Sequence, residues 1–447
     1  MNKYVPLTLE EQDYMLNKIG VDSIDDLFSD IPLNIKRQDP LKINESMSEI
    51  EVRQWMKKLS DKNANLEDYT SFLGAGSYDH YIPSIVRHIA SRSEFYTSYT
   101  PYQPEISQGT LQYIFEFQSM MAELTGMDVI NASMYDGATA TAEGAMMAVR
   151  SVNRNKIIAS GTMNPEILKV LETYCHFREI ELEIIPVKNG KTDFEYFNQM
   201  NQDVAAVIVQ NPNFYGIIEE MDEIVVKAHE NKSLVVMNVD PISLGLIKSP
   251  GEYGADIVVG EGQSLGIPQS FGGPYLGFIG ATQKLMRKMP GRICGLTEDI
   301  EGKRGFVLTL QAREQHIRRE KATSNICSNQ SLCSLMAVVY LSTMGKSGIK
   351  EVAEQCITKA NYAMNTLIET GLFKKAFDGP IFKEFTLVSS IDPKVINEAL
   401  LNNQMIGPLS LGKYGDDLSH HVIFAITEKR SKQEIDAMVQ VIREVAK

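Results

Sequence analysis

The sequence predicts an α/β protein, with a large domain around a mostly parallel sheet and a small α+β domain after it. Two observations predict this fold class. Short apolar runs rich in β-branched residues alternate with helical patterns through the middle of the chain, as is typical of parallel sheets. Capping signals and strand patterns then recur near the C-terminal end. The candidate parallel strands are residues 156–159, 182–185, 205–210, 234–239 and 256–259.

Composition indicates a globular chain whose partners are neither nucleic acid nor membrane. The 447 residues are 43% hydrophobic, which suits a large domain and a smaller one. Lys and Arg number 44 against 57 Asp and Glu, and the net charge of −13 disfavours nucleic acid and anionic membranes. No apolar run approaches the ~20 residues of a membrane span. We therefore expect no nucleic acid and no membrane among the partners.

The cysteines and the N-terminal residues predict a cytoplasmic protein. Five cysteines are scattered without a C-x-x-C pair, which suits free thiols in a reducing compartment. Residues 1–6 lack the apolar core of a signal peptide. Adjacent His420 and His421 would point to opposite faces of a strand, and we interpret His80 and His88 as structural, so we expect no metal site.

The chain is predicted to divide at about residues 65 and 325. Residues 1–65 carry three helix-start signals of the Ser/Thr-x-x-acid type and are expected to form short polar helices. Such helices are too short to fold alone, and they form either a plain N-terminal cap or a contact with another chain. Residues 66–325 hold the strands of the large domain. Residues 326–447 form the small α+β domain, which ends in an amphipathic helix.

Acidic residues occupy two places where this kind of sheet binds ligands. Residues 234–239 form an apolar strand pattern that ends at Asp240. Open α/β sheets bind ligands beyond the carboxyl ends of their strands, but an Asp before Pro is equally a turn or cap residue. Asp136 and Gly137 precede a helical run of small residues. That helix start could bind an anion, although ordinary N-capping by Asp136 is the interpretation that we favour.

Residues 96–108 form a proline-bearing loop dense in tyrosines and amides. Its prolines exclude a helix interior and a central strand. Phenols and amides are costly to bury without hydrogen bonds, so loops of this kind often form interfaces or pocket walls. A plain structural loop fits the composition equally well. The candidate residues of a substrate or interface pocket are Tyr96, Tyr99, Thr100, Tyr102, Gln103 and Gln108.

Four segments carry the most specific motifs of the chain. They are residues 99–109 (YTPYQPEISQG), 131–140 (NASMYDGATA), 251–266 and 319–327 (REKATSNIC). These motifs resemble those of glycine decarboxylase, the P-protein family of the glycine cleavage system, and the likeness covers nearly the whole chain. In that family the enzyme is one long chain of two similar halves or two separate subunits. This chain is similar to the N-terminal half.

The resemblance implies the aspartate-aminotransferase fold, which is fold type I of the pyridoxal-phosphate enzymes. In that fold a strand-end Asp, here Asp240, pairs with the pyridine nitrogen, and the helix start at Asp136-Gly137 forms the phosphate cup. A Lys after the next strand forms the Schiff base. This chain has no Lys in residues 249–283 and has Gln263-Ser264 at that place. Asp136, Gly137 and Asp240 would then form a relic cofactor site.

The resemblance also implies a division of labour between two subunits. The partner, glycine dehydrogenase subunit 2, would supply the Schiff-base Lys and hold pyridoxal phosphate covalently, whereas this chain would bind no cofactor covalently. The implied complex is a heterotetramer that decarboxylates glycine and passes the aminomethyl group to the lipoyl arm of the H-protein. This chain would contribute a pocket wall and no catalytic side chain of its own.

Two alternatives fit the same residues. A complete pyridoxal-phosphate enzyme working without the Lys is one, but Gln263 and Ser264 are not bases near neutral pH. A non-catalytic scaffold or pseudoenzyme that stabilises a catalytic partner is the other. The charged run 313–321 is also open to two interpretations, since a solvated helix face and a contact with an acidic partner or a carboxylate both fit it. The resemblance to the P-protein family implies a place for this run at the edge of an active site. Composition favours the solvated face.

Overall fold

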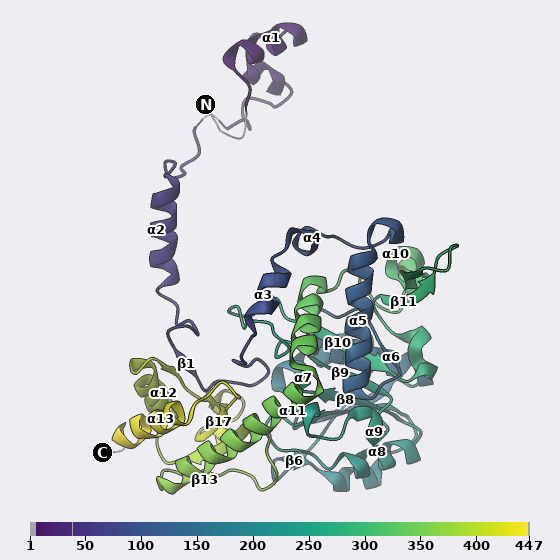
Figure 1. Cartoon of the computed structure of the whole chain (residues 1–447), viewed down its shortest axis with the longest axis vertical. Coiled ribbons are helices and arrows are strands. Elements are labelled where there is room, and N and C mark those ends of the chain that lie inside the picture. The colour runs from purple at the N-terminus through teal and green to yellow at the C-terminus, as the bar shows by residue number, and fades with distance from the viewer. Residues whose placement is uncertain (1–5, 38, 446–447) are drawn as a thin grey trace. The chain divides into compact units, whose positions relative to one another are not determined.

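The computed structural model describes residues 6–37 and 39–445, which fall into two compact units separated between residues 63 and 64 (Figure 1). The prediction that residues 1–6 lack the apolar core of a signal peptide falls mostly on residues 1–5, which lie outside the described residues. The candidate site lies in the second unit.

The first unit consists of short capped helices. Helix α1 (Leu9–Ile19) begins with a capping box at Thr8 and ends at Gly20, whose φ is 87°. The 3-10 helix η1 (Ile24–Phe28) and helix α2 (Glu49–Ser60) begin with capping boxes as well. All three helix starts predicted from the sequence are confirmed. Neither α1 nor α2 contains a buried residue.

The second unit is built around a sheet that has seven strands in the described part of the chain, in the order β2-β10-β9-β8-β7-β3-β4. The five predicted strands are neighbours and run parallel, so the predicted sheet is confirmed. Strand β10 pairs antiparallel with both of its neighbours. The strands are β2 (Val129–Ile130), β3 (Lys156–Ser160), β4 (Glu181–Ile185), β7 (Val204–Asn211), β8 (Leu234–Val239), β9 (Ile257–Glu261) and β10 (Gly277–Ala281).

Alternate residues of the central strands face two hydrophobic cores, one on each side of the sheet. In β7, Val207 and Val209 lie in one core, and Ala206 and Ile208 lie in the other. Both faces are therefore covered by helices, which explains why the parallel strands read as continuous apolar runs. The first core includes α5 (Gln108–Thr125), α8 (Met221–Glu230) and α11 (Ser331–Glu369), and the second includes α6 (Gly137–Val152) and α7 (Pro165–His176).

Helix α11 joins the large sheet to the C-terminal elements. Ala337 and Tyr340 pack in the first core of the large sheet, whereas Ala363 and Leu367 pack in the core of the C-terminal sheet. The helix is interrupted at Gly345, where φ is 60° and ψ is −176°. By length and composition alone, α11 could cross a membrane, but its most apolar window is 44% buried inside the protein. Because α11 serves both cores, the predicted division near residue 325 stays a prediction.

The C-terminal elements form an antiparallel sheet of order β13-β14-β17-β16, whose core also includes residues of α11 and of the two C-terminal helices. The predicted capping box at Ser431 is confirmed, because Glu434 N–H donates to Ser431 Oγ and Ser431 N–H donates to Glu434 Oε2. The elements are β13 (Phe373–Lys375), β14 (Glu384–Ser389), α12 (Pro393–Asn402), β16 (Leu409–Ser410), β17 (His421–Ala425) and α13 (Lys432–Val445).

Several elements were not anticipated from the sequence. A hairpin of β11 (Ile293–Glu298) and β12 (Arg304–Thr309) covers the start of α5. The remaining elements are β1 (Thr70–Ser71), α3 (Ser84–Ala90), α4 (Ser93–Tyr96), η2 (Pro104–Ile106), β5 (Val187–Lys188), β6 (Lys191–Thr192), η3 (Phe194–Gln199), η4 (Ser243–Gly245), α9 (Pro250–Tyr253), η5 (Gln283–Lys288), η6 (Gln311–Arg313), α10 (Gln315–Arg318), η7 (Arg319–Lys321), β15 (Met405–Ile406), η8 (Leu411–Lys413) and η9 (Asp416–Leu418).

The C-terminal end of α5 touches α9 through two glycines. A Cβ added at Gly251 would overlap the backbone of Gly126, which cannot move aside as a side chain could. We expect Gly251→Ala to lower the free energy of unfolding by about 1–3 kcal/mol. Gly109→Ala, in the first turn of α5 with open space around it, is the matched control and should be neutral or slightly stabilising. Urea unfolding measures both, and equal effects would contradict this packing.

Candidate functional site

The candidate site is a cavity at the carboxyl ends of the central parallel strands. This is where open α/β sheets bind their ligands. The cavity measures about 60 Å³. Three parts of the second unit meet there: the strand ends, the loop around residue 78, and the start of β14. Its lining residues include Tyr78, Asp240, Glu261, Gln263, Lys383 and Glu384.

Asp240, predicted as a candidate binding residue, forms a buried ion pair with Lys383. Asp240 Oδ2 lies 2.5 Å from Lys383 Nζ, and the two side chains are 14% and 2% exposed. Lys383 Nζ is also 3.0 Å from His80 Nε2 and 3.5 Å from the ring centroid of Tyr78. Asp240 Oδ1 accepts a hydrogen bond from Ile242 N–H at 3.1 Å. Asp240 therefore stabilises a turn, as one of its two interpretations expects, and its other oxygen pairs with a side chain of the same chain. Its role toward a ligand stays a prediction.

Sequence reasoning missed Lys383. It lies 143 positions beyond Asp240, at the start of a strand pattern where a Lys would ordinarily be exposed. One signal was available, because residues 381–385 place Lys383 and Glu384 inside an otherwise apolar run. A buried charged pair within such a run needs partners of opposite charge or hydrogen-bond donors.

The start of α6 is capped by two carboxylates. Asp136 Oδ1 accepts from Thr139 N–H at 2.7 Å, as expected for ordinary N-capping. Glu261 Oε2 accepts from Gly137 N–H at 2.9 Å. Glu261 Oε1 accepts from two further backbone N–H groups, those of Gln263 and Leu276. Burial raises the pKa of Glu261 to about 7, although these three backbone donors oppose the shift.

Gln263 lies at the place where the resemblance puts the Schiff-base Lys. Its Oε1 accepts from Tyr78 N–H at 2.9 Å, and its Nε2 donates to the carbonyls of Tyr78 and Ile267. The side chain is therefore fully used in fixing the loop around residue 78 against the sheet. Ser264 is buried beside it and also lines the cavity. Neither residue offers an amine.

Pyridoxal phosphate does not fit this site. The cofactor requires an amine for its aldehyde, a carboxylate for its pyridinium nitrogen, and free N–H groups for its phosphate. Here the carboxylate of Asp240 is bound by Lys383, and the N–H of Gly137 is bound by Glu261. The volume of about 60 Å³ is also far below the roughly 300 Å³ at which ligand pockets begin.

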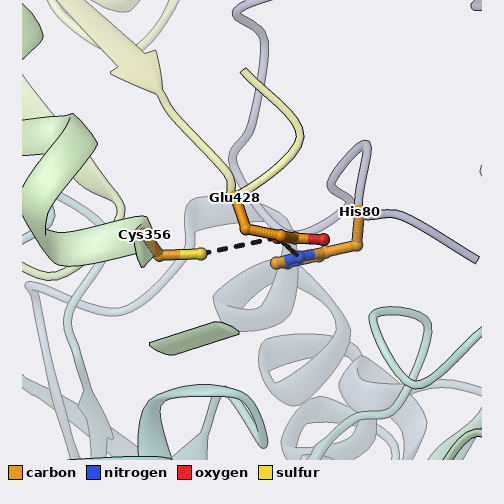
Figure 2. A group of neighbouring side chains, drawn as sticks. All are labelled: His80, Cys356 and Glu428. Carbon is orange, nitrogen blue, oxygen red and sulfur yellow. Dashed lines mark hydrogen bonds and ion pairs between the residues drawn. The ribbon is translucent and has the colours of Figure 1, made fainter. Parts of the chain in front are cut away.

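A second cluster of buried side chains, formed by His80, Cys356 and Glu428, lies beside Lys383 (Figure 2). His80 Nδ1 is 2.6 Å from Glu428 Oε2, and Cys356 Sγ is 3.6 Å from the same oxygen. Burial raises the pKa of Glu428, but the charge and hydrogen bond of His80 outweigh it and bring the pKa to about 2. The three ligand atoms are close enough to suggest a metal. However, burial raises the pKa of the Cys356 thiol, and Lys383 at the far side of His80 would repel a cation.

The predicted tyrosine loop lies against the β11–β12 hairpin and not in the cavity. Gln108 binds the backbone of Phe306 through both ends of its amide, each at 2.9 Å. Tyr102 Oη accepts from Arg292 Nη2 at 3.0 Å, and the Tyr102 ring lies beside the same guanidinium. Tyr96 and Tyr99 are 69% and 85% exposed. Among the described residues that line the cavity there is none of this loop, Thr100 and Gln103 included, so its role in a shared pocket stays a prediction.

The charged run 313–321 is only partly the solvated face that its composition predicts. Arg313 donates to the carbonyls of Met289, Leu310 and Gly291, and it thereby ties the run to the start of the hairpin. Glu314 is buried, with Oε2 3.7 Å from Arg292 Nε. The residues after Glu314 are mostly exposed. The first residues of the run are thus structural, and the remainder faces solvent.

The parallel strands, the reversed strand β10 and the carboxylate at the end of β8 define an α/β protein of the pyridoxal-phosphate fold type I class. A NifS-like protein aligns with a TM-score of 0.63, and a sphingosine-1-phosphate lyase of Burkholderia pseudomallei K96243 aligns with one of 0.65. At 11% identity, both show the fold alone. The model of the family "Glycine cleavage system P-protein" matches residues 2–442, and the chain belongs to that family.

Relatives with high identity extend over the full length of the chain. Two carry the name "Probable glycine dehydrogenase (decarboxylating) subunit 1". The one from Desulfitobacterium hafniense is 51% identical and covers 99% of both chains. The one from Listeria monocytogenes serotype 4a is 53% identical and covers 98% of both. A crystal structure of the glycine decarboxylase P-protein in inhibitor-bound form is 40% identical, with a TM-score of 0.91 over 99% of this chain and 100% of that chain.

The ion pair between Asp240 and Lys383 predicts strong coupling of their substitutions. We expect Lys383→Met and Asp240→Asn each to lower the free energy of unfolding, by about 3–5 kcal/mol where a charge is left buried and unpaired. The double variant should lose about 1–3 kcal/mol less than the sum of the two. Lys374→Met, at an exposed position of the same small sheet, should change stability by less than about 0.5 kcal/mol. Additive losses in urea unfolding would contradict the pair.

Glu261 predicts a specific dependence of stability on pH. Its folded pKa of about 7 lies above the ordinary value of 4.5 for a Glu carboxyl, so the folded state binds the extra proton and loses stability as pH rises from about 4.5 to 7. Glu261→Gln removes this titration. We expect the variant to gain about 2–3 kcal/mol relative to the natural chain across that range. Exposed Glu67→Gln is the control. A difference between Glu261→Gln and the natural chain that does not change with pH would refute the shift.

Proposed function

We propose that this chain is the subunit without the Schiff-base Lys in a two-subunit glycine decarboxylase. The observation that carries the proposal is a cofactor site without its amine, in a chain that covers 98–99% of its relatives named subunit 1. Subunit 2 supplies the Lys and holds pyridoxal phosphate. The cofactor, when bound there, accepts the electrons of the bond that breaks in glycine. The aminomethyl product passes to the lipoyl arm of the H-protein.

This chain contributes one wall of the working pocket. Tyr102 is the best-placed side chain of its tyrosine loop for that role. Its hydroxyl accepts from Arg292, so its own hydrogen stays available to donate, and the residue is 45% exposed. Arg292 is 2% exposed and is held near Glu314, which fixes the phenol in position. A fixed donor of this kind suits a carboxylate or a phosphate oxygen of a ligand held by the partner.

Exposed apolar residues support association with subunit 2 in a heterotetramer. In the first unit, Trp55 of α2 and Leu9 of α1 are exposed, although side chains of this type are usually buried. The tyrosine loop adds Tyr99 on the second unit. The five cysteines are free, which supports a cytoplasmic setting.

A non-catalytic scaffold is the second candidate, and the closed site of this chain favours it equally. A scaffold would stabilise subunit 2 without touching glycine or the cofactor. The two candidates differ in what happens when the tyrosine loop is changed without disturbing assembly. Reconstitution of this chain with subunit 2 therefore decides between them.

Reconstituted complexes test the pocket wall. We expect Tyr102→Phe to assemble normally with subunit 2 and to lower glycine–bicarbonate exchange by on the order of 10²-fold, as for the loss of a donor used in the transition state. Tyr414→Phe is the matched control, because its hydroxyl forms no hydrogen bond with a described residue. Gln108→Ala should instead reduce stability, because it removes the bonds to Phe306. Normal exchange by a fully assembled Tyr102→Phe complex would favour the scaffold.

A further inference from the structure

The lining of the cavity includes an ammonium and a carboxyl group that come from this chain itself. Lys383 Nζ lies 2.5 Å from Asp240 Oδ2, beyond the end of β8. The Glu261 carboxyl group, at the end of β9, accepts from Gly137 N–H at the start of α6. Pyridoxal phosphate would bring the same two charges: a cationic N–H donor for the strand-end carboxylate, and anionic oxygens for the helix N-terminus.

We propose that Lys383 and Glu261 replace the two charged ends of pyridoxal phosphate, so that the cofactor site of this chain is filled by its own side chains. A carboxylate at a buried strand end and free N–H groups at a buried helix start are both costly without partners. In an enzyme of this fold, the cofactor provides those partners. Here two side chains provide them, and the chain folds without a cofactor.

Lys383 is held in this position from several sides. Besides Asp240, it meets His80 Nε2 at 3.0 Å and the Tyr78 ring at 3.5 Å. His80 is in turn fixed by Glu428, at 2.6 Å from its other ring nitrogen. An ammonium that is 2% exposed could move away from Asp240 only by giving up all of these contacts. The Lys383 side chain is therefore a fixed part of the site and does not swing away from Asp240 to admit a ligand.

Glu261 is fixed in the same manner. Its two carboxylate oxygens accept from three backbone N–H groups, of Gly137, Gln263 and Leu276. The approach is so close that a Cβ at Gly137 would lie 2.9 Å from the Glu261 Cβ. The carboxylate thus occupies the space next to the first turn of α6, where a phosphate oxygen would have to approach.

The test uses the full chain alone, with pyridoxamine phosphate as the probe. This compound carries the pyridine nitrogen and the phosphate but has no aldehyde, so it cannot label surface lysines. For the natural chain we expect no saturable binding in equilibrium dialysis and no change in Tm. Binding of one equivalent with a rise in Tm, abolished by Asp240→Asn, would overturn the proposal.

Variants test whether these two side chains close the site. Lys383→Ala with Glu261→Ala should gain a Tm that rises with pyridoxamine phosphate, because binding to the folded state raises Tm. Lys374→Ala with Glu67→Ala, both at exposed positions, should show no such rise. A folded Lys383→Ala, Glu261→Ala chain whose Tm does not change with pyridoxamine phosphate would overturn the proposal. If that variant does not fold, the binding measurement on the natural chain tests the proposal by itself.

Lys383 and Glu261 both belong to this chain, so the chain without subunit 2 tests their role independently of the proposed function. A failure of the proposed function would appear as no glycine–bicarbonate exchange when subunit 2 is added. A failure of the present inference would appear as binding of the probe to the chain alone. The two results are independent of each other.

Discussion

The buried ion pair between Asp240 and Lys383 is the interaction on which the site depends. A carboxylate at the end of a buried strand cannot remain there without a cation or several hydrogen-bond donors. Lys383, the residue directly before β14, meets this need and so joins the small sheet to the large one. The same ammonium faces His80 and Tyr78, which bring in the N-terminal loop of the second unit. Three segments far apart in sequence therefore meet at one charge.

The parallel sheet could be predicted from the sequence because its signal is local. Strands such as 234–239 are short apolar runs, buried on both faces, and the structure places their ends within one or two residues of the prediction. Strand β10 was not predicted, because it contains two glycines and follows Gly-Gly-Pro, which is a pattern typical of a turn. The β11–β12 hairpin was not predicted either, because several of its positions are polar or exposed and the strands therefore lack a continuous apolar run.

The sequence predicted the residues of the site that stand at strand ends and helix starts, but not the residues that bind them. Asp240, Asp136 and Gln263 stand at strand ends or helix starts, and such places can be read from a local pattern. The long-range partners cannot, because Lys383 reaches Asp240 and Tyr78 reaches Gln263 only through tertiary folding. For the tyrosine loop, the local pattern predicts more than this chain alone provides. Its composition predicts a pocket wall, but both ends of the Gln108 amide bind the backbone of Phe306. The loop could line a pocket only together with another chain.

The central claim is that this chain leaves the covalent handling of the cofactor to its partner. The most direct measurement is borohydride reduction of the assembled complex with pyridoxal phosphate, followed by peptide mapping of both chains. The account predicts one stoichiometric adduct, on a Lys of subunit 2, and none on this chain. A stoichiometric adduct on Lys383, or on Lys248 or Lys284 at the edges of the Lys-free segment, would contradict it.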